Sequence, residues 1–378
     1  MDRVLVYGLK DPVGGVEKVV LSYARQMTRD YDISFDFVLF TGEFSLENEI
    51  LEMGCRVWYA PSRKSDYSGY QKFMDRLFAE NRYVAVWGNY SGLTNIDLLV
   101  LAKKYGVSVR VAHSHVSRLY WGSPIMKYVV HVLHYGNRLR LPSYATHYFA
   151  CSEVSRDFMF PKKLRQRTDL IHNAIDTDVF HPDAAAGQMV RRELGLSEDA
   201  LVVGHVARMC EVKNQKFLLE VMAKLLARRP EARLLFVGEG ELWDELKTKT
   251  RELQIRDKVI FTGNRSDVAR LLQAMDVFVL TSLSEGLSLS SVEAQACGVP
   301  CVLPTAVSPE TDITGGVRFV PLEAGAEHWA TAIEEMAGAR IDDPAQKLAA
   351  KGYDMGSAAQ KLYYEFVGER HEDRNPDV

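Results

Sequence analysis

Short apolar runs alternate with segments of helical spacing along almost the whole chain. Apolar runs of this length are typical of buried strands, and strands that alternate with helices form parallel sheets of βα units. The pattern predicts strands at residues 4–7, 33–39, 57–59, 84–87, 107–112, 147–150, 169–171, 201–206, 234–237, 259–262, 277–281, 301–303 and 317–319. It predicts helices at residues 16–29, 46–53, 67–81, 95–105, 125–137, 154–160, 215–229, 241–253, 268–274, 290–297, 327–337 and 356–368. We therefore expect an α/β protein with parallel sheets.

The alternation is interrupted by a polar stretch with Ala and Gly at residues 177–199. The strand pattern restarts at residue 201, and 378 residues are many for one hydrophobic core. We predict a first domain at residues 1–185, a second domain at residues 186–355 and a flexible tail at residues 371–378. In doubly wound domains of this kind, ligands bind at the carboxyl ends of the strands.

The composition is that of an ordinary soluble globular protein, with 47% hydrophobic and 25% charged residues. No apolar run reaches the ~18 residues of a membrane span, and the first predicted strand begins near Val4, which leaves no room for a secretory signal. The five cysteines are scattered, without the spacing of a zinc site. We expect a cytoplasmic protein that needs no metal and no cofactor.

The net charge of −4 hides a local excess of positive charge. Between Asp97 and Glu153 there is no acidic residue, while Lys, Arg and five His residues occur there together with aromatic residues. Such an excess is typical of a surface for an anionic partner, here an anionic membrane surface or acceptor. The residues expected to take part are Arg118, Trp121, Lys127, Arg138 and Arg140. The alternative is a partly buried helix with a solvated basic face, and nucleic acid is disfavoured because no known binding module accompanies the charge.

Two glutamates, Glu285 and Glu293, are separated by seven residues directly after the apolar run at 277–281. The turn between this predicted strand and the helix at 290–297 offers backbone amides at a helix N-terminus, where phosphate binds well. One carboxylate is then expected on the loop and the other in the first turn of the helix. Carboxylates accept hydrogen bonds from hydroxyl groups. The pair therefore brackets a phosphate site with two hydroxyl-binding groups, which is the layout that a nucleotide sugar needs.

This segment resembles the E-x7-E signature of retaining glycosyltransferases with the GT-B fold, most nearly family 4, which includes enzymes of capsule, exopolysaccharide and O-antigen synthesis. Other motifs of that family occur in its order: a glycine loop (Gly14-Gly15), a histidine motif (His113, His115), an interdomain signature (172–176) and a diphosphate-binding pair (Arg208, Lys213). The resemblance extends from about Val4 to Phe366. It implies two Rossmann-like doubly wound domains that face each other across a cleft, with a C-terminal helix at 356–370 that completes the first domain.

The resemblance also implies roles for these residues. Arg208 and Lys213 would neutralise the leaving diphosphate, and His113 or His115 would contact the donor sugar. Glu285 would bind the sugar hydroxyls and Glu293 the ribose. The expected catalytic residues are His113, His115, Arg208, Lys213 and Glu285. The expected donor-binding residues are Gly14, Gly15, Arg208, Lys213, Asn264, Arg265, Glu285, Gly286, Leu287, Ser288, Leu289, Ser290 and Glu293. Taken singly, the glycines also fit a plain turn, the cations a solvated loop and the histidines a buried core.

We therefore expect a retaining hexosyltransferase that acts at the cytoplasmic face of the membrane. It would move a hexose or N-acetylhexosamine from a nucleotide sugar, with UDP favoured, to a lipid-linked or polysaccharide-precursor acceptor. Retention without an obvious carboxylate nucleophile implies that the leaving diphosphate assists removal of the acceptor proton. Two other functions stay open, a GT-B nucleotide-sugar epimerase and a non-catalytic binding component of a polysaccharide assembly complex.

Overall fold

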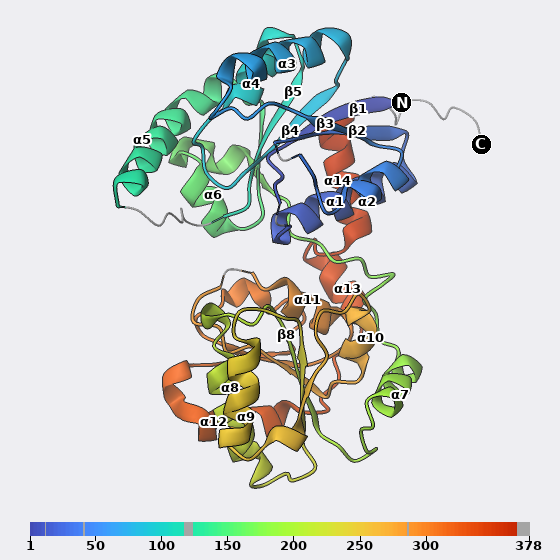
Figure 1. Ribbon diagram of the computed structural model, residues 1–378. Helices are drawn as coiled ribbons and strands as arrows, with labels where there is room; N and C mark the ends of the chain where they lie inside the picture. Colours follow the sequence, from blue (N-terminus) through green and yellow to red (C-terminus); the bar gives the residue numbers. More distant parts are fainter. Residues whose placement is uncertain (12, 41, 117–123, 286, 369–378) are drawn as a thin grey trace, which may run out of the picture. The chain divides into compact units, whose positions relative to one another are not determined.

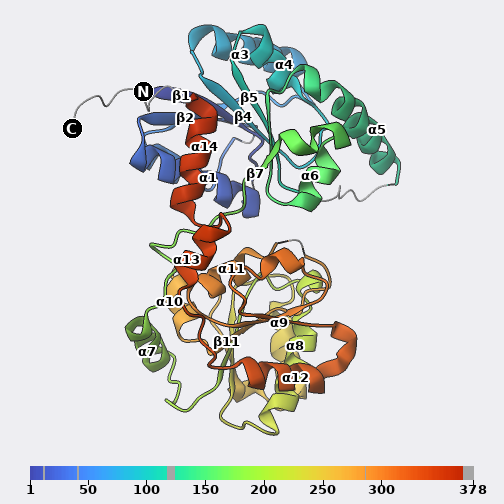
Figure 2. The ribbon, with the colours of Figure 1, turned by 180° about the vertical axis from the view of Figure 1, so that it is seen from behind.

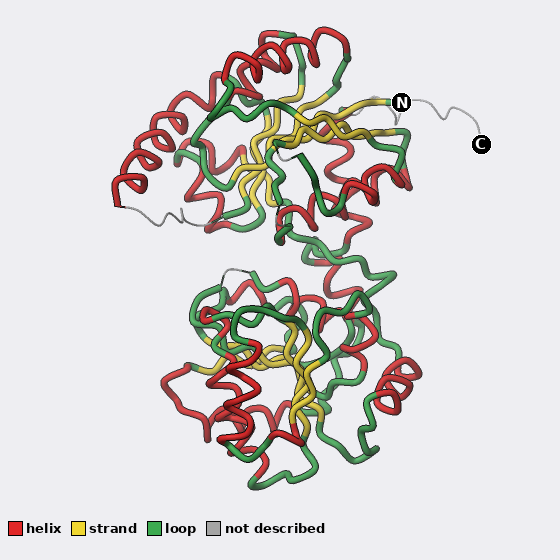
Figure 3. The backbone as a smooth tube through the Cα atoms, viewed as in Figure 1, coloured by secondary structure: helices red, strands yellow, loops and turns green. Residues whose placement is uncertain are grey.

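The structure, a computed structural model, describes residues 1–11, 13–40, 42–116, 124–285 and 287–368. The chain forms two compact units, Met1–Ala174 with Met355–Val378, and Ile175–Asp354. In each unit, helices cover both faces of a parallel sheet (Figure 1, Figure 3). The predicted fold class of two Rossmann-like doubly wound domains is thereby confirmed. The first division between the units follows Ala174, whereas the sequence placed it after residue 185.

The first unit is built on a parallel sheet with the strand order β3-β2-β1-β4-β5-β6-β7. Its strands are β1 (Asp2–Tyr7), β2 (Ile33–Leu39), β3 (Arg56–Tyr59), β4 (Ala85–Tyr90), β5 (Val109–Ser114), β6 (His147–Ala150) and β7 (Thr168–Leu170). Its α-helices are α1 (Gly15–Asp30), α2 (Glu47–Glu52), α3 (Tyr67–Glu80), α4 (Asp97–Lys104), α5 (Pro124–Arg140), α6 (Glu153–Met159) and α14 (Met355–Val367).

Helix α14 is the C-terminal helix that the resemblance led us to expect, and it packs beside α1 in the first unit (Figure 2). Its Tyr363 stacks on Tyr31 with ring centroids 4.1 Å apart, and its Phe366 lies 5.4 Å from the ring of Trp87 on β4. The opposite face of the sheet is covered by a buried cluster that includes residues of α3, α4 and α6. Aromatic burial on both faces therefore fixes β4 in the middle of the unit.

The second unit has the parallel strand order β10-β9-β8-β11-β12-β13. Its strands are β8 (Val202–Val206), β9 (Arg233–Val237), β10 (Val259–Phe261), β11 (Val277–Val279), β12 (Cys301–Pro304) and β13 (Val317–Val320). Its α-helices are α7 (Ala184–Glu193), α8 (Gln215–Leu226), α9 (Trp243–Glu252), α10 (Val268–Gln273), α11 (Leu289–Ala296), α12 (Gly325–Met336) and α13 (Pro344–Ala350). One face is buried under α8, α9 and α12, and the other under α7, α10 and α11.

Two helices, α7 and α13, were not predicted. Helix α7 lies in the polar stretch that was read as the break between the domains. It begins after Asp183, whose carboxylate accepts a hydrogen bond from the amide of Ala186, and Gly187 lets the helix approach Gln273 closely. An N-cap Asp before a run of Ala was the available signal.

Each sheet reverses its strand order at one point, between β1 and β4 in the first unit and between β8 and β11 in the second. The loops that leave the carboxyl ends of two such strands turn to opposite faces of the sheet and leave a crevice for a ligand. The predicted site residues lie largely in these loops.

Candidate active site

In the second unit, the loops after β8, β9 and β10 are joined by their backbones. The amide of Met209 donates to the carbonyl of Glu239 (2.9 Å), and the amide of Gly238 donates to the carbonyl of Gly263 (2.9 Å). Gly238 has a φ of +120°, and a Cβ atom there would lie 2.3 Å from the carbonyl oxygen of Ala207. Glycine is therefore required for this approach, which holds the loops at one edge of the sheet.

Lys213 and Glu285 meet across the point where the strand order reverses. Lys213 ends the short 3-10 helix after β8, Glu285 lies in the loop after β11, and Lys213 Nζ is 2.5 Å from Glu285 Oε1. The other oxygen of Glu285 accepts a hydrogen bond from the hydroxyl of Ser282 (2.9 Å). The hydroxyl of Thr281 donates to the carbonyl oxygens of Lys213 and Asn214, which fastens the two loops together. The side chains of Lys213 and Glu285 are only 19% and 17% exposed, so this ion pair is partly desolvated.

Arg208 lies on the same loop as Lys213 but is held more loosely. Its guanidinium pairs with Glu241 at 3.1 Å, and its side chain is 75% exposed. An exposed ion pair contributes about 0–1 kcal/mol, so this pairing can exchange for a ligand anion at little cost. Arg208 and Lys213 thus differ in exposure, since Arg208 is largely solvated and Lys213 lies in a mostly buried ion pair.

Asn264 and Arg265 point to different partners. The side-chain amide of Asn264 donates to Glu239 (3.2 Å), an exposed carboxylate in the loop after β9. Arg265 forms two 2.7 Å hydrogen bonds with Asp267 and a third contact with Glu193 on α7, so its guanidinium is held by carboxylates of its own loop and of α7. Glu239 was not selected from the sequence, although its position between two glycines after a strand was a signal.

Glu293 lies on α11, which begins at Leu289, so it is the fifth residue of the helix. The prediction that it occupies the first turn is therefore wrong, because the N-cap is Ser288 and no acidic residue lies in the first turn. The hydroxyl of Ser288 accepts from the amide of Ser291 and lies 3.3 Å from the hydroxyl of Ser290. The favourable effect of the helix dipole on a first-turn carboxylate does not account for Glu293.

Three further predicted donor-binding residues, Leu287, Leu289 and Gly286, belong to the same segment. The side chains of Leu287 and Leu289 are partly buried against the cluster around α11 and α13. Gly286 lies outside the described residues.

The two predicted histidines differ in environment although their rings are 4.1 Å apart. His113 is 1% exposed, and its Nδ1 accepts a hydrogen bond from the indole of Trp87 (3.2 Å). Its Nε2 is buried without a partner, and burial lowers the pKa of His113 well below its usual range. His115 follows the end of β5 and is partly exposed. Of the two, His115 is the one that a ligand can reach.

Asn89 orients His115. Its amide nitrogen is 3.4 Å from the carbonyl oxygen of Tyr7, so its oxygen faces His115 Nε2 at 2.8 Å. Burial lowers the pKa of His115 to about 3. At neutral pH this ring is uncharged, with a proton on Nε2 and a lone pair on Nδ1, and it can accept a hydrogen bond from a sugar hydroxyl.

The glycine loop of the first unit is capped by a side chain of its own. The amide of Gly14 donates to the Glu17 carboxylate (2.8 Å), which is 2% exposed and also accepts from the amide of Lys10. Gly15 begins α1. This amide already donates to a buried carboxylate, whose charge would repel a phosphate there.

Three of the five predicted membrane or acceptor residues are described. Lys127 and Arg140 are exposed on α5. Arg138 instead donates to the carbonyl oxygens of Asp157 and Phe160 at the end of α6, where it has a structural role. Arg118 and Trp121 lie outside the described residues. Among the described residues, no helix combines the length and the hydropathy needed to cross a bilayer.

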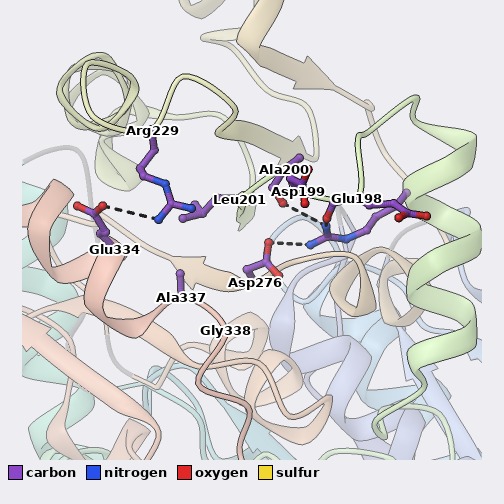
Figure 4. Close-up of a pocket in the computed structure, with 10 residues that line it drawn as sticks. Glu198, Asp199, Ala200, Leu201, Arg229, Asp276, Glu334, Ala337 and Gly338 are labelled. Atoms are coloured by element: carbon purple, nitrogen blue, oxygen red, sulfur yellow. Dashed lines mark hydrogen bonds and ion pairs between the residues drawn. The ribbon is translucent and has the colours of Figure 1, made fainter.

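A cavity of about 260 Å³ lies at the amino end of the second sheet (Figure 4). Its two arginines are paired, Arg191 with Asp276 at 2.7 Å and Arg229 with Glu334 at 3.7 Å. Residues 198–201 complete much of its wall. Because ligands of doubly wound sheets bind at the carboxyl end, this cavity is not part of the candidate site.

Comparison with known proteins decides the family. Residues 188–337 match the family described as Glycosyl transferases group 1. EpsF of Bacillus subtilis (strain 168), a putative glycosyltransferase, is 31% identical over 353 residues, which cover 90% of each chain. The chain belongs to the group 1 glycosyltransferases. The resemblance to GT-B glycosyltransferases is thereby confirmed.

Other relatives agree with this family. A UDP-Gal:alpha-D-GlcNAc-diphosphoundecaprenol alpha-1,3-galactosyltransferase of Escherichia coli is 31% identical over 140 residues, 36% of each chain. The crystal structure of HepE from Anabaena in complex with UDP has a TM-score of 0.75 at 18% identity, and the match covers 96% of this glycosyltransferase and 98% of HepE. WaaG, a glycosyltransferase involved in lipopolysaccharide biosynthesis, has a TM-score of 0.67 at 14% identity, and the match covers 97% of this chain and 100% of WaaG. Both structures support the fold.

Proposed function

We propose that this glycosyltransferase moves a hexose or N-acetylhexosamine from a nucleotide sugar, with UDP favoured, to a lipid-linked glycan acceptor, with retention at the anomeric carbon. The observation that carries the proposal is the Lys213–Glu285 pair at the reversal of strand order in the second sheet. It offers a cation for a diphosphate and a carboxylate for sugar hydroxyls within one ordered contact. HepE, which was solved with UDP, and the relative from E. coli, whose name contains a UDP sugar and a diphosphoundecaprenol acceptor, support the substrate classes.

In the proposed reaction, the bond between the anomeric carbon and the diphosphate breaks, and the acceptor oxygen bonds to that carbon on the same face. The leaving diphosphate takes the acceptor proton. Lys213 and Arg208 stabilise the negative charge that develops on the diphosphate, and Glu285 orients the sugar through its hydroxyl groups. His115 holds a sugar hydroxyl and is a poor base for the acceptor proton, because burial lowers its pKa to about 3. The proposal includes no metal ion.

Donor binding is tested by the thermal unfolding of the chain with UDP, GDP and ADP sugars. A donor at about 100 times its Kd adds about 2.7 kcal/mol of stability, and we expect this for UDP sugars only. Turnover with a polyprenyl-diphosphate-linked sugar is then measured with and without a chelator, and NMR gives the anomeric configuration of the product. A free, altered nucleotide sugar formed without acceptor would identify an epimerase instead. No stabilisation by any nucleotide sugar would favour a non-catalytic component.

We also propose that the enzyme works as a peripheral protein at the cytoplasmic membrane face. The basic, acid-free region between Asp97 and Glu153 supports this proposal. A diphosphate-linked lipid acceptor lies in a membrane, and both this acceptor and the anionic membrane surface would be attracted by positive charge.

A further inference from the structure

Helix α5 exposes its apolar side chains. Leu139 is 78% exposed, Tyr128 72%, Val132 54% and Tyr135 52%. Their spacing of four, three and four residues places all four on one stripe along the helix. Seven of the sixteen exposed large hydrophobic residues of the described chain lie on α5. Exposed apolar residues are ordinary when they are scattered, but a contiguous group marks a surface that binds a partner.

The inward face of α5 is polar at its centre. His134 is 0% exposed, and its Nδ1 accepts a hydrogen bond from the amide of Leu93 (3.1 Å). Asn137 donates to the carbonyl of Leu93 (2.9 Å), and the ring of His134 stacks on Phe158 at 4.8 Å. Rotating the helix to bury the apolar stripe would break both hydrogen bonds to Leu93 and leave its backbone unpaired. The outward position of the stripe is therefore a fixed property of the fold.

The charges beside the stripe are positive. Lys127 and Arg140 are exposed on α5, and the whole helix carries no acidic residue. The stripe from Tyr128 to Leu139 is about 17 Å long at 1.5 Å per residue, which is too short to span a bilayer of about 30 Å but suits a helix that lies in its surface. A bilayer with anionic headgroups offers an apolar interior for the stripe and negative charge for the lysine and arginine beside it.

We propose that α5 lies in the plane of an anionic bilayer and inserts the stripe of Tyr128, Val132, Tyr135 and Leu139 below the headgroups. Lys127 and Arg140 contact the phosphates beside it. This inference rests on the proposed function and refines its membrane attachment. It assigns the attachment mainly to the insertion of apolar side chains and not to the basic charges alone.

The test measures sedimentation of the full chain with vesicles of phosphatidylcholine alone and of phosphatidylcholine with phosphatidylglycerol, at low and high salt. The variant carries Tyr128→Ser and Leu139→Ser. A matched control carries Leu51→Ser and Met189→Ser, which remove exposed apolar residues from α2 and α7 (53% and 61% exposed). A third variant carries Lys127→Ser and Arg140→Ser. Circular dichroism and stabilisation by UDP are measured for each variant.

We expect wild type and the control to bind the anionic vesicles and to retain part of this binding at high salt. The Tyr128/Leu139 variant should lose about tenfold or more in affinity at both salt concentrations, since the loss of buried apolar carbons is not screened by ions. The Lys127/Arg140 variant should lose binding mainly at low salt. Unchanged vesicle binding of the Tyr128/Leu139 variant would overturn the inference, as would no binding of wild type. Self-association that Leu139→Ser abolishes, without vesicle binding, would make a second copy the occupant. Vesicle binding without stabilisation by UDP would contradict the donor proposal and leave this inference intact.

Discussion

The two points of strand reversal use opposite kinds of chemistry. In the second unit, Lys213 and Glu285 form a charged pair that is partly open to solvent. In the first unit, the side chains that β4 and the end of β5 present are neutral: Asn89 and His115 are hydrogen bonded at 2.8 Å. The carboxylate of Glu17 nearby is buried and already accepts from two backbone amides. Gly8, with a φ of +105°, lets β1 approach Asn89, because a Cβ there would lie 2.0 Å from the Asn89 carbonyl oxygen.

In the proposed function, the two doubly wound units of the chain take different parts of the reaction. A charged edge suits the anionic diphosphate, whose charge increases as the bond to the sugar breaks. A neutral edge suits hydroxyl groups, which need donors and acceptors of fixed direction and no net charge. The proposed function therefore assigns donor charge to the second unit and hydroxyl recognition to both. The following variants test this assignment.

The largest effect is expected from Lys213→Ala. It removes the cation of the charged pair and leaves the Glu285 carboxylate, which would repel a diphosphate. We expect kcat to fall by about 10² to 10³, the usual loss for one preorganised donor to the leaving group. Steady-state kinetics with a UDP sugar and a lipid-linked acceptor measure this.

Lys216→Ala is the matched control. Lys216 lies on α8, where its ammonium pairs with Glu211 (3.0 Å) and Glu245 (2.8 Å). We expect its turnover to equal that of wild type. Wild-type turnover in Lys213→Ala as well would show that this loop does not act on the diphosphate.

The histidines of the first unit separate stability from activity. His113→Ala removes a buried ring between Trp87 and Phe149, so we expect a loss of about 2–4 kcal/mol in unfolding free energy, seen as a lower Tm. His115→Ala should lower turnover by about tenfold, because one hydrogen bond to a hydroxyl is lost, and should change the Tm much less. A larger loss of Tm in His115→Ala than in His113→Ala would reverse these roles.

The sequence was sufficient to predict the strands, because a buried parallel strand is marked by an apolar run with turns at both ends. The runs at residues 33–39 and 147–150 became β2 and β6 without a change of bounds, and the other predicted strands occur with small shifts at their ends. Helix α7 was missed because its first residues, Ala184 to Gly187, carry no apolar periodicity, and its burial against α10 depends on tertiary contacts.

The candidate site was predicted only in part. The spacing of Glu285 and Glu293 selected a segment that does join a strand to a helix, β11 to α11, because strand, turn and helix follow one another in sequence. Glu285 has one partner in its own loop, Ser282, which its proximity in sequence suggests. Its other partner, Lys213, comes from the loop after β8, and this contact depends on β8 lying beside β11, which periodicity does not encode. Likewise, no local signal distinguishes the buried His113 from the accessible His115, since Asn89 and Trp87 reach them from a neighbouring strand.

A smaller effect is expected from removing the charge of one glutamate. Glu293→Gln should weaken the binding of plain UDP by about tenfold if its carboxylate accepts from the ribose, because an amide offers only one acceptor oxygen. Glu285→Gln should leave UDP binding nearly unchanged and weaken binding of the UDP sugar instead. Calorimetry with UDP and with a UDP sugar separates the two, and equal loss of UDP binding in both variants would contradict the division between ribose and sugar.

The smallest effect is expected in the pH dependence of stability. Burial holds the pKa of His115 at about 3 and that of His205, in the second unit, at about 4, both below the value of about 6.5 in an unfolded chain. At a pH between the folded and the unfolded pKa of such a histidine, the unfolded state binds more protons than the folded state. The stability that each neutral ring contributes is therefore complete above about pH 6.5 and is lost as the pH falls toward the pKa of the folded state. Urea unfolding from pH 7 to pH 4.5 should therefore show decreasing stability, and His115→Gln should reduce this decrease while UDP binding stays unchanged, because the charged pair of the second unit does not involve His115. The same pH dependence in His115→Gln and wild type would show that His115 is already solvated and that the neutral edge of the first unit is less well protected than its hydrogen bond to Asn89 indicates.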